Sequence, residues 1–263
     1  MREVLEKLVK GQISMDDAEK LLKIFAIEEI GNLARIDAGR KFRKGIPEII
    51  LAEGKRAEDV AEIALSMLNE KGRAIISRAT KEQMHAIKVV VPSEAFLQVD
   101  DKVGLMVVKK KGFEVKRTGG KVGILTAGTS DIPVAEEARV VAEEMGCEVI
   151  TAYDVGVAGI HRLFPPLKEM VEKDVDVIVV VAGREGALPS VVAGMVDAPI
   201  VAVPTSIGYG LGEKGVSALM AMLQACPLGL AVVNIDGGVA AGAVAASIAN
   251  RVAKFKKSKE GRS

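Results

Sequence analysis

Two hydrophobic patterns divide this chain of 263 residues. From about residue 121 onward, uninterrupted runs of Val, Ile and Leu alternate with segments in which apolar residues recur at helical spacing. Such strands are typical of a parallel sheet that helices cover on both faces. The predicted strands are 122–126, 148–152, 175–181, 200–203 and 230–235, and the predicted helices are 133–145, 164–172, 188–196, 216–225 and 239–254. We therefore predict a three-layer α/β domain over 121–254.

The first part of the chain, to residue 118, has a mixed pattern. Ser14 stands at the N-cap of a predicted amphipathic helix whose apolar positions are Leu21, Leu22, Phe25 and Ile30. Further predicted elements are strands at 48–51 and 74–77, a helix at 57–68, and a hairpin of 104–109 with 114–116. Thr118-Gly-Gly120 is the best linker candidate. We expect a smaller mixed α/β domain over 1–118 and a polar tail over 255–263.

Composition and charge exclude several function classes. A net charge of +1, 3% aromatic residues and no Trp argue against a polyanion binder and against base-stacking platforms. The charged start does not resemble a secretory signal, and no apolar run reaches membrane-spanning length. Cys147 and Cys226 have no metal-ligand spacing and are expected to be reduced. We expect a cytoplasmic protein without nucleic-acid or membrane partners, and we assign no residue as a metal ligand.

Polar and glycine-rich segments follow the first two strands of the predicted parallel sheet, where ligands bind in such folds. Thr129, Ser130 and Asp131 follow the first strand, and their turn could hold a phosphate or simply cap the next helix. Asp154 and the pair His161-Arg162 follow the second strand. Arg162 could grip a phosphate, and His161 could titrate near neutrality or be structural.

Similar segments follow the third and fourth strands. Arg184 and Glu185 follow the third, where Glu185 could act as a general base or favour the start of a helix. Thr205, Ser206 and Gly208 follow the fourth, in a loop that could close over a ligand but lacks the P-loop ending. Cys226 lies at a helix end before Pro227, and is either an inert small residue or a reactive thiol.

Several of these motifs together resemble a known family. The C-terminal motifs resemble the PurE-type aminoimidazole ribonucleotide (AIR) carboxylase/mutase domain, which has a flavodoxin-like parallel sheet. They resemble more closely its relative LarB, the pyridinium-3,5-biscarboxylic acid mononucleotide synthase. The motifs are 122–131, His161-Arg162, 182–189 and 237–242, with 37–40, 43–48, 53–55 and 77–79 matching the N-terminal signature of LarB, which PurE proteins lack.

The resemblance to LarB implies a specific activity. LarB proteins carboxylate the pyridinium ring of nicotinic acid adenine dinucleotide at C5 and hydrolyse its phosphoanhydride, which releases AMP. The product is a precursor of the nickel-pincer nucleotide cofactor of lactate racemase. The family cysteine matches Cys226 and a family carboxylate matches Glu185. Carbon dioxide or bicarbonate is the implied co-substrate, a requirement for Mg²⁺ is left open, and the implied assembly is a homo-octamer.

The roles of the N-terminal basic residues and two other functions remain open. Arg40, Arg43, Lys55 and Arg78 could bind phosphates or carboxylates, or form surface ion pairs. The main alternative function is an AIR carboxylase or mutase of purine biosynthesis, whose chemistry needs neither Cys226 nor the N-terminal segment. The other alternative is a nucleotide-binding sensor without turnover. The longer loop before His161 leaves a PurE-like proton-transfer role for that residue in question.

Overall fold

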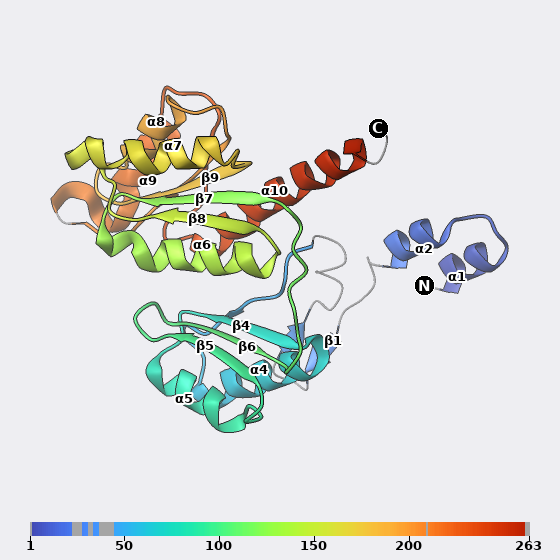
Figure 1. Cartoon of the computed structure of the whole chain (residues 1–263). Coiled ribbons are helices and arrows are strands. Elements are labelled where there is room, and N and C mark those ends of the chain that lie inside the picture. The colour runs from blue at the N-terminus through green and yellow to red at the C-terminus, as the bar shows by residue number, and fades with distance from the viewer. Residues whose placement is uncertain (1, 23–27, 31–33, 37–44, 209, 261–263) are drawn as a thin grey trace. The chain divides into compact units, whose positions relative to one another are not determined.

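The computed structural model describes residues 2–22, 28–30, 34–36, 45–208 and 210–260. The chain divides into two compact units, Met1–Phe113 and Glu114–Ser263, and each unit builds its own sheet (Figure 1). Within the described residues, no helix combines the length and the apolar character needed to cross a membrane.

The second unit is built on five parallel strands, which confirms the predicted fold. The strands are β7 (Lys121–Thr126), β8 (Glu148–Ala152), β9 (Val177–Ala182), β10 (Ile200–Pro204) and β11 (Leu230–Val232). Their order is β11-β10-β9-β7-β8. Every residue of β9 and β10 is buried, as expected for strands with helices on both faces. All five carboxyl ends therefore meet at one edge of the sheet.

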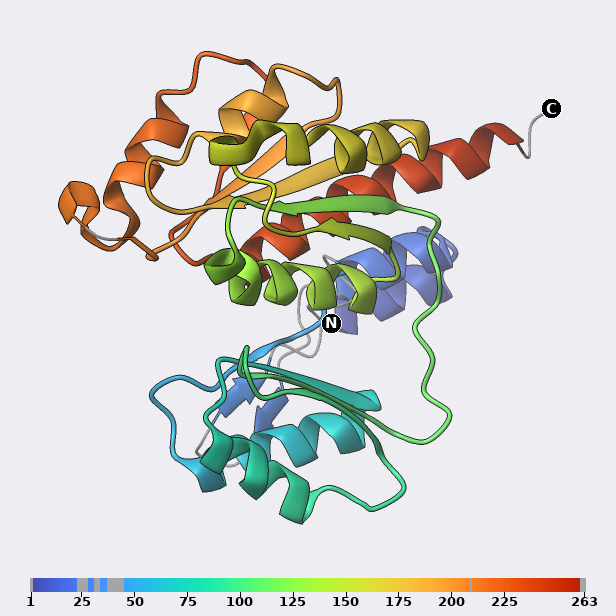
Figure 2. The same ribbon diagram turned by 60° about the vertical axis from the view of Figure 1, so that its left-hand side comes forward.

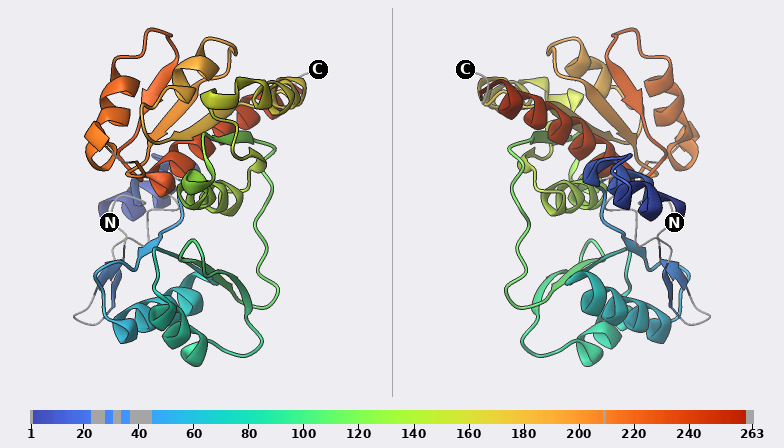
Figure 3. Two further views of the ribbon diagram at one scale, coloured as in Figure 1. Left: turned by 90° about the vertical axis from the view of Figure 1, so that its left-hand side faces the viewer. Right: turned by 90° about the vertical axis from the view of Figure 1, so that its right-hand side faces the viewer.

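Helices cover both faces of this sheet (Figures 2 and 3). One face carries α6 (Ile132–Glu144) and α10 (Gly238–Glu260), and the other carries α7 (Phe164–Glu172), α8 (Leu188–Ala193) and α9 (Val216–Leu223). A Cβ on Gly242 would lie 2.5 Å from the carbonyl oxygen of Ala138, so this glycine permits close packing of α10 on α6. The helix α10 continues past the predicted end at 254, as far as Glu260.

The first unit contains a mixed four-stranded sheet with two helices packed on it. The strand order is β3 (Ile50–Leu51), β4 (Arg73–Ser77), β6 (Leu105–Lys109) and β5 (Phe96–Asp100), and only the β3–β4 pair is parallel. Helices α4 (Ala57–Lys71) and α5 (Lys81–Val90) share an apolar core with this sheet. The preceding elements are α1 (Arg2–Val9), α2 (Met15–Leu22) and the antiparallel pair β1 (Glu28–Ile30) and β2 (Ala34–Ile36).

Several details predicted for the first unit are wrong. Residues 114–116 form no strand, and β6 pairs instead with β5, which the sequence did not reveal because an exposed edge strand carries a weak apolar pattern. The structure describes this helix as α2 over Met15–Leu22, and Ile30 belongs to β1 instead of the helix, while Phe25 lies outside the described residues. The predicted N-cap is confirmed, since the Asp17 N–H donates to Ser14 Oγ at 3.1 Å.

Candidate functional site

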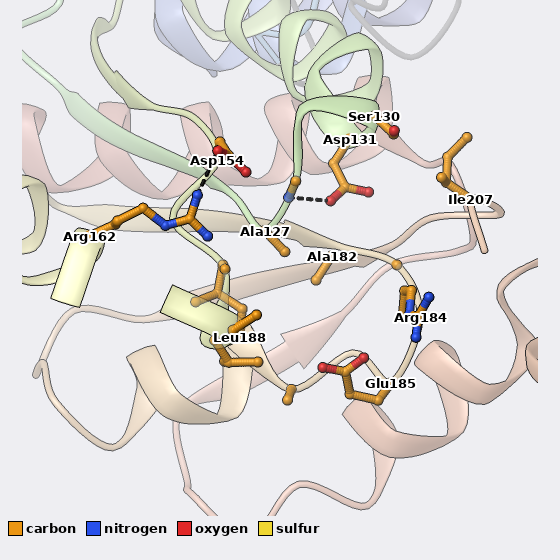
Figure 4. Close-up of a pocket in the computed structure, with 16 residues that line it drawn as sticks. Ala127, Ser130, Asp131, Asp154, Arg162, Ala182, Arg184, Glu185, Leu188 and Ile207 are labelled. Atoms are coloured by element: carbon orange, nitrogen blue, oxygen red, sulfur yellow. Dashed lines mark hydrogen bonds and ion pairs between the residues drawn. The ribbon is translucent and has the colours of Figure 1, made fainter. Parts of the chain in front are cut away.

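A cavity of about 340 Å³ opens at the carboxyl edge of the parallel sheet, beyond the ends of β7, β8 and β9 (Figure 4). This is the edge at which ligands collect in open α/β sheets. The polar side chains that line it are Ser130, Asp131, Asp154, Arg162, Arg184 and Glu185. The fold thus brings together six residues that the sequence analysis singled out.

Asp131 is the most buried of these polar residues. It lies after β7, at the end of a short 3₁₀ turn, Thr129–Asp131, and its residue exposure is only 4%. One carboxylate oxygen accepts the Thr205 hydroxyl at 2.7 Å and the other accepts the Gly128 N–H at 2.9 Å. Desolvation raises the pKa of Asp131, and these two hydrogen bonds partly oppose that rise. The cavity therefore contains a carboxyl group that holds its proton more tightly than an exposed aspartate does.

Asp154 and Arg162 form the ion pair on the β8 side of the cavity. Arg162 Nη1 lies 2.6 Å from Asp154 Oδ2, and both side chains keep partial exposure. Asp154 has a positive φ of 58°, and its N–H donates to Thr126 Oγ1 at 3.0 Å. The pair holds the guanidinium at the cavity wall, where its remaining donors can meet an anionic group. Such a group could accept hydrogen bonds from the guanidinium N–H groups of Arg162 that the Asp154 carboxylate does not occupy.

The turn before Asp154 is anchored to α6 by a side-chain network. The Tyr153 hydroxyl donates to the Glu136 carboxylate, which also pairs with Arg139 at 2.6 Å. Burial and the neighbouring Glu136 raise the pKa of Tyr153 to about 12, so the phenol keeps its proton at neutral pH. This contact links the β8 turn to the helix whose start carries Asp131.

Arg184 and Glu185 occupy the turn between β9 and α8. Arg184 and Gly186 both have positive φ values, of 54° and 62°. A Cβ on Gly186 would lie 2.8 Å from the Ala218 carbonyl oxygen, so the turn packs closely on α9. Figure 4 shows Arg184 and Glu185 on one side of the cavity and Asp154 and Arg162 on the other. Glu185 lines the cavity but remains exposed in a single copy of the chain.

The loop after β10 contacts residues that form the cavity wall. The Ser206 N–H donates to Asp236 Oδ1 at 2.8 Å, and the charge of Asp236 adds to the rise in the pKa of Asp131. Gly208 lies beside the backbone of Arg184, since a Cβ there would be 3.9 Å from the Arg184 nitrogen. The sequence analysis missed Asp236. Its signal was its place after the last strand of the sheet, at the same edge as the other polar turns.

The remaining predicted site residues do not line this cavity. Thr129 and His161 are exposed beside it, and Cys226 is exposed on the loop between α9 and β11. Lys55 lines a separate cavity of about 410 Å³ in the first unit. Arg78, which does not line that cavity, pairs with Glu53 at 3.3 Å. Two further predicted residues, Arg40 and Arg43, lie outside the described residues.

The part of the chain that the structure describes contains no group of three or more His, Cys, Asp or Glu side chains arranged to hold a metal ion.

Two family models match the chain, and they divide it between them. Residues 121–259 match the model of AIR carboxylase. Residues 27–110 match the model of the LarB/PurE-like N-terminal domain. The cavity described above lies entirely within the region that matches the AIR carboxylase model.

Curated relatives fall into two groups by how much of the chain they match. An uncharacterized protein of Methanocaldococcus jannaschii is 46% identical over 251 residues, which are 95% of this chain and 96% of that protein. The N5-carboxyaminoimidazole ribonucleotide mutases of Thermotoga maritima and M. jannaschii are 30% and 33% identical. They match 49% and 48% of this chain, and 74% and 76% of their own lengths. The second unit is thus similar to carboxylase- and mutase-type enzymes.

Proposed function

Because this chain belongs to the LarB family, with a LarB/PurE-like N-terminal domain ahead of an AIR carboxylase domain, we propose that it carboxylates nicotinic acid adenine dinucleotide at C5 of the pyridinium ring and hydrolyses the phosphoanhydride. The products are pyridinium-3,5-biscarboxylic acid mononucleotide, for nickel-pincer nucleotide synthesis, and AMP. The observation that carries the proposal is the pairing of these two domains, since the mutase relatives align with only about half of this chain.

The cavity supplies groups suited to an anionic nucleotide. Arg162 and Arg184 place two guanidinium groups on its walls. Guanidinium groups bind phosphates and carboxylates through paired hydrogen bonds. Asp131, with both oxygens already hydrogen-bonded on one side, can accept a ribose hydroxyl on its remaining lone pairs. In this proposal the arginines hold the charged groups of the substrate and Asp131 orients the sugar.

Carboxylation requires that an electron-poor ring first become nucleophilic. We assign that step to the Cys226 thiolate, which forms an S–C bond at C4 and converts the pyridinium into a neutral dihydropyridine. Its C5 is then an enamine carbon, and the enamine electron pair forms a C–C bond with carbon dioxide. Glu185 takes the C5 proton, the ring regains its aromatic electrons, and the S–C bond breaks to release the thiolate. Cysteine suits both halves of this sequence because it is a good nucleophile and a good leaving group.

The test is to incubate the full-length protein with nicotinic acid adenine dinucleotide and isotopically labelled bicarbonate, and to weigh the products. The expected result is a labelled dicarboxylated mononucleotide together with AMP. A parallel incubation with N5-carboxyaminoimidazole ribonucleotide tests the activity named for the mutase relatives. Turnover of that compound alone would replace the proposal with the mutase function, and binding of the dinucleotide without product would leave a sensor.

A further inference from the structure

A cluster of charged side chains on α6 lies outside the cavity but is connected to its wall. Arg139 donates to the Glu136 carboxylate through Nε to Oε1 at 2.9 Å and through Nη2 to Oε2 at 2.6 Å. Its Nη1 donates to Glu143 at 2.7 Å. The Tyr153 hydroxyl, which follows the end of β8, donates to the same Glu136 carboxylate. These four residues are not among those that line the cavity.

The ion pair of Arg139 and Glu136 fixes an acceptor for Tyr153. A guanidinium that meets a carboxylate through two donors holds it in one orientation. Because the Glu136 side chain is only 12% exposed, the pair carries a desolvation penalty, and such pairs add little stability over apolar side chains of similar size. What the pair provides is a carboxylate of fixed direction. Burial and Glu136 raise the pKa of Tyr153 to about 12, so the hydroxyl donor is present throughout the neutral range.

Asp154, the residue after Tyr153, is held from both sides. On one side the Tyr153 side chain is anchored to α6. On the other, the N–H groups of Asp154 and Val155 donate to the Thr126 hydroxyl at 3.0 Å and to the Thr126 carbonyl oxygen at 2.9 Å. Asp154 has a φ of 58°, in the left-handed region, and a residue other than glycine stays there when its surroundings fix it. The Tyr153 contact is one of these constraints.

The orientation of Arg162 depends on where the Asp154 backbone lies. Arg162 Nη1 meets Asp154 Oδ2 at 2.6 Å on the cavity wall (Figure 4). The two side chains are 38% and 48% exposed, so packing alone does not hold them in place. Half-exposed ion pairs have little energy of their own with which to maintain one geometry. A shift of the Asp154 turn would therefore carry the guanidinium with it.

We propose that Tyr153 and Glu136 are positioning residues, which act through Asp154 to hold the Arg162 guanidinium where it meets an anionic group of the bound nucleotide. The inference rests on the proposed function for the identity of that nucleotide. Neither residue touches the reacting ring, so their contact affects binding and leaves the chemical step that follows binding nearly unchanged. Their removal should raise Kd and KM and spare kcat.

The first experiment is a double-mutant cycle on binding, with calorimetry measuring Kd for nicotinic acid adenine dinucleotide. Tyr153→Phe removes only the hydroxyl and should raise Kd about tenfold, as expected when a hydrogen bond to a charged group is lost. In an Arg162→Ala protein, the same change should have no further effect, because the group that it positions is gone. An unchanged Kd for Tyr153→Phe overturns the proposal, as does an equal loss of affinity in both backgrounds.

The second experiment separates positioning from general damage through steady-state kinetics. Tyr153→Phe should raise KM about tenfold and keep kcat within about twofold of the wild-type value. Glu136→Gln keeps an oxygen that can accept the Tyr153 hydroxyl, so it should lose less affinity than Glu136→Ala. Glu143→Gln, at the outer end of the cluster, is the matched control and should leave KM unchanged. A fall in kcat at constant KM would refute a role in positioning.

The third experiment needs no nucleotide. Phenylglyoxal modifies arginine side chains, and mass spectrometry of peptides gives the rate at Arg162, with Arg184 on the other side of the cavity as the internal reference (Figure 4). Tyr153→Phe should raise the rate at Arg162 and leave the rate at Arg184 unchanged. Equal rates at Arg162 in the two proteins overturn the proposal. A wild-type protein that neither binds nor converts the dinucleotide would refute the proposed function, and the modification rate would still decide whether Tyr153 positions Arg162.

Discussion

The two edges of the parallel sheet differ in how far a single copy of the chain completes them. At the carboxyl edge, Asp131 and Thr205 are buried and hydrogen-bonded to each other, and the cavity has a defined wall. At the amino edge, Cys226 and Leu228 are exposed on a loop. Both edges carry residues that the proposed chemistry needs.

This contrast follows from the topology of the sheet. Parallel strands place all their carboxyl ends together, so the turns that follow them converge and one chain can build a cavity there. Each crossover helix returns the chain to the other edge, and a residue placed there is removed from that cavity by the length of the helix.

The largest expected effect is on the amino edge. Replacing the exposed thiol, Cys226→Ala, should abolish carboxylation because no nucleophile remains to form the dihydropyridine. The free energy of unfolding should change by less than about 0.5 kcal/mol, since the side chain is exposed. Incorporation of labelled bicarbonate and urea denaturation measure the two quantities. The matched control Cys147→Ala should keep the activity and lose stability instead, because Cys147 is buried. Substantial labelling by Cys226→Ala would remove the covalent step.

A large but incomplete loss is expected at the carboxyl edge. Glu185→Gln keeps the shape of the side chain but cannot take the C5 proton, so kcat should fall more than about tenfold, or roughly 1.4 kcal/mol in the barrier. KM for the dinucleotide should change much less. Steady-state kinetics separate the two, with Glu172→Gln on the outside of α7 as the control. A kcat within tenfold of the wild-type value would show that another group is the base.

A moderate effect on stability is expected inside the cavity wall. Thr205→Val removes the hydroxyl that donates to Asp131 and should cost about 1–3 kcal/mol at neutral pH, because it leaves a buried carboxylate one donor short. Thr205→Ser retains the hydroxyl and should lose much less. Urea denaturation measures both variants. A Thr205→Val protein as stable as the wild type would mean that this hydrogen bond contributes nothing to the free energy of unfolding.

The pH dependence of this effect follows from the raised pKa of Asp131. Relative to the unfolded chain, the folded protein gains stability from the protonated carboxyl below the ordinary value of 3.8 and loses that gain as the pH rises through the folded pKa. Removal of the Thr205 donor raises that pKa further. The difference in stability between the wild type and Thr205→Val should therefore grow from about pH 4 to pH 7. A difference independent of pH would point to lost packing instead.

The smallest effect on folding is expected at the exposed apolar surface. Leu228→Ser should change the folding of each chain by less than about 0.5 kcal/mol, but it should weaken the association of copies. Circular dichroism and light scattering at micromolar concentration measure the two properties. Val9→Ser on α1, where the side chain is 88% exposed, is the matched control and should leave the assembly unchanged. A wild-type protein that is monomeric at this concentration would contradict the octamer implied by the resemblance.

The regular half of the fold could be predicted closely from the sequence. Continuous apolar strands alternate with helices there, and burial on both faces leaves little ambiguity about where each strand runs. The first unit could not be predicted as well. Its edge strand β5 is largely exposed, and α5 is marked mainly by the capping box of Thr80 and Gln83. Weak periodicity in these two elements led to the wrong hairpin.

The sequence by itself determined the class of the fold, the edge at which polar turns gather, and the family to which the chain belongs. These properties follow from local periodicity and from short motifs, both of which can be read along the chain. Only the tertiary structure decided which motif residues share a cavity, that Asp236 acts on Asp131, and that Cys226 lies at the other edge from Glu185. Distance in space depends on the order of the strands and the length of the crossover helices, which no motif encodes.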